Sequence, residues 1–310
     1  MKNYFGFTLS AKQLLPVWLI FYALFIIPYV LLIFQLKNIQ PGTPPSGMIF
    51  LYLFLLILAA FSITFYFTKL TIENVQYNNK PITFNGTFGK YFGVMLGGFL
   101  LSIITLGIYS TWFIRNICRF FVDNSVYENE PFSFKGKGGK LFLIITFSLL
   151  IPIIILSVIL AKAFVIVPGQ FSLSFFLTQQ ALVWLIMIPY IYLVYKWEVN
   201  IDYKNFNLTW DTKFLDACGK LALELFLTFI TLGIYYPMAM MKLYSYFTHR
   251  TILISADSKK IFGFEEDHIN DFLFIWGQLL LSLITLGIYY PWMISKVGSR
   301  ILSRTYIESN

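Results

Sequence analysis

Long stretches of apolar residues dominate the pattern of hydrophobic and polar positions along this chain. A helix needs roughly 20 consecutive apolar residues to cross about 30 Å of hydrocarbon. Four stretches reach that length without a charged side chain, at 14–36, 48–68, 141–161 and 173–195. The pattern predicts four membrane-spanning helices. The first is too long for the core of a signal peptide, so we expect it to be retained.

Three further apolar runs share one motif. The pentapeptide TLGIY lies at 105–109, 231–235 and 285–289, within apolar runs that cover 91–109, 214–236 and 272–294. The second of these runs also contains Asp216, Lys220 and Glu224. The sequence thus predicts an all-α polytopic membrane protein with about seven hydrophobic segments. Four of these segments span, and the three TLGIY segments either span or re-enter.

A second recurring pattern precedes two of the apolar runs. "NKPITFNGTFGK" (79–90) and "NEPFSFKGKGGK" (129–140) begin with Asn-x-Pro and end with Gly-Lys. Asn-x-Pro indicates a turn, and ITF or FSF has the alternation of a short strand. Gly86 and Gly136 permit a tight bend into the following helix. We therefore expect internal repeats with short strand-like loop entries. The spacing in GKGGK is not that of a phosphate-binding loop.

Composition strengthens the membrane interpretation. The chain is 58% hydrophobic and 12% charged, whereas soluble domains are about 45–50% apolar and about 25% charged. The net charge of +8 does not indicate nucleic-acid binding, because the aromatic residues lie inside the apolar runs and not among the basic ones. The two cysteines lack the spacing of a metal or redox motif, and no serine lies in a nucleophile pattern. We expect no enzymatic activity, metal or cofactor.

The distribution of Lys and Arg separates two topologies. If all seven runs cross the bilayer, these residues divide almost equally between the two sides, although membrane proteins carry a cytoplasmic excess. If the TLGIY segments enter and leave on one side, only Lys37 and Lys162 of the 23 basic residues lie on the other side. Charge therefore favours four crossings with both termini in the cytoplasm, whereas hydropathy favours ordinary spans that end at TLGIY.

The TLGIY motif has the residues of a turning point. Its glycine can adopt the backbone angles that end a helix, and a proline after two of the copies prevents simple continuation. Tyr and Trp suit the membrane interface. The residues expected to form this turn motif are Gly107, Tyr109, Trp112, Gly233, Tyr235, Pro237, Gly287, Tyr289, Pro291 and Trp292. The alternative is that the motif only marks the interfacial end of an ordinary span.

Basic residues follow the motif at helical spacing. Arg115 and Arg119 are one turn apart, as are Arg300 and Arg304, so each pair shares a helix face. An amphipathic helix on an anionic leaflet has this pattern, and each basic residue near the surface contributes about 1 kcal/mol. We expect these four arginines to contact lipid headgroups, which makes membrane lipids the expected partners.

Polar residues inside the TLGIY runs suggest a second kind of site. In two of the runs a Glu or Gln precedes the threonine of the motif by seven residues, which is two helical turns, so both side chains share a face. One interpretation is a small polar membrane site for a cation, a proton or a headgroup. Its residues are Glu224, Gln278, Thr231, Thr285 and Thr105. The other interpretation is that Glu224 lies near the cytoplasmic face and pairs with Lys220.

These motifs together resemble a known family. "ITFNGTFGKYF" and "LLSIITLGIYSTWFIRNICRFF", between residues 82 and 121, carry the resemblance most fully. "FSFKGKGGKLF" (132–142) and "LITLGIYYPWMISKVGSRIL" (283–302) follow. The chain resembles the YjgN-like bacterial inner-membrane proteins of unknown function over most of 75–310. The resemblance implies a polytopic inner-membrane protein and brings no established activity.

The expected organisation has four parts. Residues 1–74 and 141–200 form two-helix membrane hairpins, 75–140 holds the first TLGIY copy, and 201–310 holds the other two copies with a basic C-terminal helix. We expect a multi-pass protein of the bacterial inner membrane. Two functions are open: transport or conduction of a small solute or ion, and a lipid-engaging structural or envelope-organising role without transport.

Overall fold

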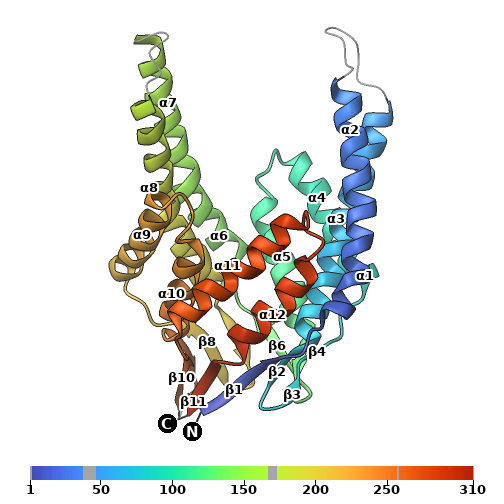
Figure 1. Cartoon of the computed structure of the whole chain (residues 1–310), viewed down its shortest axis with the longest axis vertical. Helices are drawn as coiled ribbons and strands as arrows, with labels where there is room; N and C mark the ends of the chain where they lie inside the picture. The colour runs from blue at the N-terminus through green and yellow to red at the C-terminus, as the bar shows by residue number, and fades with distance from the viewer. Residues whose placement is uncertain (1, 38–46, 167–172, 257, 310) are drawn as a thin grey trace.

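The order strand, helix, helix, strand recurs along the chain. The structure is a computed structural model that describes residues 2–37, 47–166, 173–256 and 258–309, and within these residues the order occurs five times. We number these units 1 to 5. Each unit begins and ends in one sheet, and its helices form a hairpin that projects away from the sheet (Figure 1).

Two of the five units carry long helices. Unit 1 consists of β1 (Lys2–Phe7), α1 (Ala11–Phe21), a π-helical turn (Tyr22–Ile26), α2 (Ile27–Lys37), α3 (Gly47–Glu73) and β2 (Val75–Tyr77). Unit 3 consists of β6 (Glu130–Phe134), α6 (Gly138–Ile145), a π-helical turn (Thr146–Leu150), α7 (Ile151–Ile166), α8 (Leu173–Glu198) and β7 (Ile201–Tyr203). The hairpins of these units are the two tall projections in Figure 1.

The other three units carry short helices joined at TLGIY. Unit 2 consists of β3 (Lys80–Pro81), β4 (Thr83–Phe84), α4 (Phe88–Ile104), α5 (Ser110–Asp123) and β5 (Ser125–Tyr127). Unit 4 consists of β8 (Phe206–Trp210), α9 (Phe214–Ile230), α10 (Tyr236–Thr248) and β9 (Thr251–Ile254). Unit 5 consists of β10 (Lys259–Phe264), α11 (His268–Ile284), α12 (Tyr290–Leu302) and β11 (Thr305–Ser309).

The strands form one antiparallel sheet that is nearly closed into a ring. Their order is β3-β2-β1-β11-β10-β9-β8-β7-β6-β5-β4. The two ends of this order, β3 and β4, are separated by Ile82 alone, and they pair with β2 and β5 respectively. The two terminal strands pair with each other, with Lys2 opposite Glu308. Both termini therefore lie at the same end of the molecule (Figure 1).

The sheet corrects the expected fold class. The prediction of an all-α protein is wrong, because the described residues contain an 11-stranded sheet. The expected strand-like entries are only part of it: Thr83 and Phe84 of ITF lie in β4, and FSF lies in β6. The terminal strands and β7 to β10 are not expected from the sequence. These strands have few residues each, and a strand of that length is ordered by its neighbours in the sheet more than by its own sequence.

The inside of the ring is apolar. A cavity of about 300 Å³ within it is lined by side chains from all five units, among them Phe5, Tyr127, Phe206 and Phe262. Lys260 is the charged residue in this lining, and its Nζ lies 4.7 Å from the centroid of the Phe206 ring. The lining of this space is thus mainly aromatic and aliphatic, unlike that of a polar passage.

Among the described residues, four helices are long and apolar enough to cross a membrane, as the sequence predicts. They cover Ala11–Lys37, Gly47–Glu73, Gly138–Lys162 and Phe175–Glu198, with 27, 27, 25 and 24 residues. At about 1.5 Å per residue, each exceeds the roughly 30 Å of a hydrocarbon core. The alternative with seven crossings is wrong, because the chain reverses at each TLGIY and returns to the sheet.

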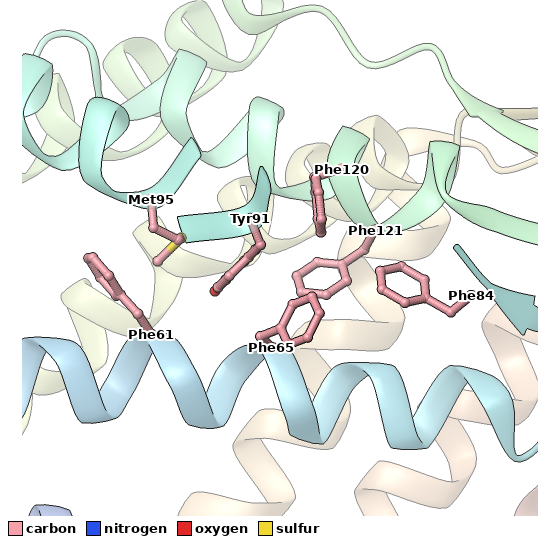
Figure 2. Close-up of a cluster of buried hydrophobic side chains, with 7 residues drawn as sticks. All are labelled: Phe61, Phe65, Phe84, Tyr91, Met95, Phe120 and Phe121. Atoms are coloured by element: carbon pink, nitrogen blue, oxygen red, sulfur yellow. The ribbon is translucent and has the colours of Figure 1, made fainter. Parts of the chain in front are cut away.

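Aromatic clusters join the base of the helical hairpins to the ring. In one cluster Phe61 and Phe65 of α3 face Tyr91 of α4 and Phe120 of α5 (Figure 2). Phe84, the last residue of β4, inserts into the same cluster, and its ring packs over Gly86 so closely that an added Cβ would overlap it. The glycine is thus needed for this close approach of the ring. Phe134 covers Gly136 in the same way.

Candidate functional site

Each TLGIY motif forms the same tight turn at the tip of a short hairpin. In unit 2 the threonine Oγ1 of Thr105 donates to the Leu101 carbonyl at 2.7 Å and accepts from the Tyr109 amide at 3.0 Å. The next two residues are left-handed, with φ of 51° at Leu106 and 89° at Gly107. Units 4 and 5 repeat this geometry, with the residues Thr231, Leu232, Gly233, Thr285, Leu286 and Gly287. The motif therefore reverses the chain.

The tips of the three hairpins expose apolar side chains. The leucine of the motif is 94% exposed at Leu106, 93% at Leu232 and 83% at Leu286. The isoleucines on both sides of each leucine are exposed as well: Ile104, Ile108, Ile230, Ile234, Ile284 and Ile288. These nine side chains, which we call the tip residues, have the character of a surface that meets lipid and not water.

At each tip, at least one carbonyl group accepts a hydrogen bond from a side chain. The Gly107 carbonyl accepts from the hydroxyl of Ser110 at 2.6 Å. The Ile234 carbonyl accepts from Nε1 of Trp276 in α11 at 2.7 Å, and the Gly287 carbonyl accepts from Nε1 of Trp18 in α1 at 2.9 Å. Irregular backbone is tolerated at membrane depth only when protein groups satisfy it, so these contacts fit an apolar surrounding.

The tyrosine of each motif accepts a hydrogen bond from the returning helix, seven residues further on. The donors are Asn116 to Tyr109 at 3.3 Å, Lys242 to Tyr235 at 2.8 Å and Lys296 to Tyr289 at 2.8 Å. Trp112 and Trp292 stack on the tyrosines of their own motifs, and the buried Pro237 and Pro291 lie in the first turn of α10 and α12. The turn-motif residues thus fix the turn to the start of the returning helix.

The members of the expected polar site are bound within separate hairpins. Glu224 is 1% exposed, and its Oε1 accepts from Lys220 Nζ at 2.6 Å. Gln278 Oε1 accepts from the Tyr289 hydroxyl at 2.9 Å. The three threonines are engaged in their own turns at three different tips. Among the described residues no hydrogen bond joins Glu224 to Gln278, so a shared polar site remains a prediction.

The arginines expected at lipid headgroups differ in their surroundings. Arg119 Nε donates to Asp123 Oδ2 at 2.9 Å and is half exposed. Arg115 Nη1 donates to Asn116 Oδ1 at 2.9 Å. In unit 5, Arg300 and Arg304 both donate to Oδ1 of Asp271, the first at 2.7 Å. The headgroup role remains a prediction for all four, and the unit 5 pair has fewer N–H groups left for it.

Sequence reasoning missed Asp271 as a structural centre. Its side chain is 1% exposed, and it joins the start of α11 to the end of α12 and to the residue before β11. A signal was present: Asp271 directly precedes the apolar run 272–294 and lies one residue outside it. The sequence pattern predicts Arg300 and Arg304 as a pair that faces lipid headgroups, which leaves the aspartate without a role.

Comparison with known protein families finds a match. The family model described as a bacterial protein of unknown function (DUF898) matches residues 79–253, which is more than half of the chain. This match confirms the expectation of a bacterial family of unknown function. No curated protein and no solved structure matches the chain.

Proposed function

The chain belongs to the DUF898 family of bacterial proteins of unknown function, and we propose that it is an integral membrane protein that engages lipids through its three TLGIY hairpins. The four long helices cross the bacterial inner membrane. The short hairpins enter the bilayer from the side of the sheet and leave on the same side. We expect the YjgN-like proteins that it resembles to share this arrangement.

The exposure of the tip residues carries this proposal. Three separate hairpins end in nine apolar side chains, led by leucines that are 83% to 94% exposed. Burying such surface in hydrocarbon is favourable by roughly 25 cal/mol per Å², whereas exposing it to water at three places would favour aggregation. Lipid is the surrounding that suits all three tips.

The length of the short helices supports insertion to about the middle of the bilayer. Helices α4, α9 and α11 have 17 residues each, which is about 25 Å at 1.5 Å per residue. Their first turns lie beside the strands and carry polar residues, so less than that length can enter hydrocarbon. A depth of about 15 Å, half the hydrocarbon thickness, accommodates the apolar part.

Charge supports an orientation with the sheet in the cytoplasm. Lys37 and Lys162 lie at the ends of the long helices that are distant from the sheet, and the other 21 of the 23 basic residues lie on the side of the sheet. Cytoplasmic segments carry the excess of Lys and Arg. We therefore propose that both termini and the sheet lie in the cytoplasm.

Labelling from one side of the membrane tests this orientation. In a variant without Cys118 and Cys218, we expect a membrane-impermeant maleimide added to intact cells to label Lys37→Cys. The reagent should reach Asn205→Cys, in the exposed turn between β7 and β8, only after the membrane is opened. Labelling of Asn205→Cys from outside, at the rate seen for Lys37→Cys, would contradict the proposal.

Conduction of an ion is the second candidate, and the burial of Glu224 favours it. An ionised carboxylate inside an apolar helix commonly marks an ion pathway, and Oε2 of Glu224 has no hydrogen-bond partner among the described residues. The lipid-engaging role predicts instead that liposomes containing the protein hold a proton or potassium gradient as long as empty ones. If the wild type dissipates the gradient and Glu224→Ala, with its fold retained, does not, the result would establish conduction.

A further inference from the structure

A polar cavity of about 290 Å³ lies between the hairpin of unit 4 and the segment that leads from β10 into α11. Its lining includes Lys220 of α9, Lys242 and Tyr246 of α10, and Arg250 at the end of the same hairpin. Glu266 and His268 contribute from the other side. The cavity is on the side of the sheet, away from the tip of the hairpin.

The three cations of this cavity have N–H groups to spare. Lys220 Nζ donates to the buried Glu224, and Lys242 Nζ donates to the Tyr235 hydroxyl. The Cζ of Arg250 lies over the Tyr246 ring, 3.6 Å from its centroid, and Nη1 donates to the Tyr246 carbonyl at 3.1 Å. An ammonium has three donors and a guanidinium five, so most of these donors remain for a ligand.

The acidic residue in the lining does not use these donors. Glu266 accepts from the Ser245 hydroxyl through Oε1, and its Oε2 lies 2.9 Å from His268 Nε2. Two other polar atoms of the lining, the Tyr246 hydroxyl and His268 Nδ1, are buried without a hydrogen-bond partner among the described residues. Buried polar atoms normally have partners, and both of these atoms belong to residues that line the cavity.

The corresponding positions of the other two short hairpins carry different residues or are already paired. When the TLGIY motifs are aligned, Lys220 corresponds to Val94 in unit 2 and to Phe274 in unit 5. Arg250 corresponds to Arg304, which donates to Asp271. Three cations beside only two carboxylates, Glu224 and Glu266, are therefore a particular feature of unit 4 among the short hairpins.

The depth of the cavity fits the phosphate of a lipid. Lys220 precedes Ile230, the last residue of α9, by ten residues, which is about 15 Å along the helix axis. If the tip of the hairpin reaches the middle of a hydrocarbon core of about 30 Å, Lys220 lies at the level of the headgroups. A long cationic side chain at that level reaches toward headgroup phosphate.

We propose that this cavity binds a phosphate group, and that in the membrane the phosphate belongs to an anionic lipid headgroup. Arg250 and Lys242 bind its oxygens through charge-assisted hydrogen bonds. The choice of a lipid rests on the proposed insertion of the hairpins, whereas the binding of phosphate rests on the cavity alone.

Lipid retention by the purified full-length protein tests this inference. We would count phosphatidylglycerol molecules bound in detergent by native mass spectrometry for the wild type, Arg250→Gln and Lys242→Gln. We expect each variant to bind phosphatidylglycerol about tenfold more weakly, because each substitution removes roughly one charge-assisted hydrogen bond to the phosphate. Lys296→Gln is the matched control, because Lys296 makes the same 2.8 Å contact with its tyrosine but lies outside the cavity.

The outcomes distinguish a lipid headgroup from inorganic phosphate as the ligand. They also distinguish a failure of the phosphate site from a failure of the proposed insertion of the hairpin tips. Equal lipid binding by Arg250→Gln, Lys242→Gln and Lys296→Gln, all with the wild-type melting temperature, would overturn the inference. Binding of inorganic phosphate that Arg250→Gln weakens, without retention of phosphatidylglycerol, would keep the phosphate site and overturn the lipid source. Either failure leaves the insertion of the tips intact, because that insertion is measured at Leu232 and not in this cavity.

Discussion

Replacing Asp271 with Asn should lower the stability of the protein by roughly 3 kcal/mol. The carboxylate is 1% exposed and accepts from both Arg300 and Arg304. Removing one member of a buried ion pair leaves the other charges uncompensated, which costs about 3–5 kcal/mol when burial is complete. The two arginines are partly exposed, so we place the loss at the lower end. A lower melting temperature in detergent would report it.

Asp267 provides a matched control for this variant. It lies four residues earlier, and its Oδ2 is 3.9 Å from Nη2 of Arg300. Its side chain is exposed, and an exposed ion pair contributes little to stability. Asp267→Asn should therefore melt close to the wild type. Equal melting temperatures for Asp271→Asn and the wild type would show that the paired arginines do not hold unit 5 together.

Replacing Leu232 with Asp should destabilise the protein in liposomes by roughly 2.5–3.5 kcal/mol. This is the cost of a charge at the centre of a membrane helix on insertion scales, and Leu232 lies at the tip of the unit 4 hairpin with 93% of its surface exposed. In water the same substitution at an exposed leucine would cost almost nothing. Thermal unfolding of the reconstituted protein, monitored by tryptophan fluorescence, measures the loss of stability of Leu232→Asp relative to the wild type.

Leu215→Asp is the control on the same helix. Leu215 is 79% exposed, but it is the second residue of α9 and lies beside the strands. An aspartate at this position meets the positive end of the helix dipole at the level of water or headgroups. We expect Leu215→Asp to unfold at or above the wild-type temperature. Similar behaviour of both variants would mean that exposure to lipid does not differ along α9.

The sequence predicts the membrane-spanning part of the fold because that part depends on local composition. A run such as 48–68 is apolar enough to identify α3 without knowledge of its neighbours. The ring depends on contacts between distant residues instead: Lys2 pairs opposite Glu308, and Phe5 opposite Tyr77. A related pattern was visible in KNYFGF (2–7) and KKIFGF (259–264), but a single short segment does not reveal its partners.

The sequence predicts that the candidate site is a turn, but it does not predict that the turn exposes apolar side chains. Glycine in TLGIY indicated a reversal, and Gly107 has the expected left-handed conformation with φ of 89°. That Leu106 is also left-handed, with φ of 51°, and almost fully exposed does not follow from composition, because leucine rarely adopts this conformation. Asp271 was missed for a similar reason, since its two arginines lie 29 and 33 residues away.

The depth of Leu232 in the bilayer tests the central claim most directly. A fluorophore would be attached to Leu232→Cys in a variant without Cys118 and Cys218, and reconstituted in liposomes with lipids brominated at the middle of their acyl chains. We predict strong quenching by these lipids and protection from iodide in the water, with the reverse for Leu215→Cys. Quenching of the Leu232→Cys label by iodide, with no effect of the brominated lipids, would contradict insertion of the hairpin.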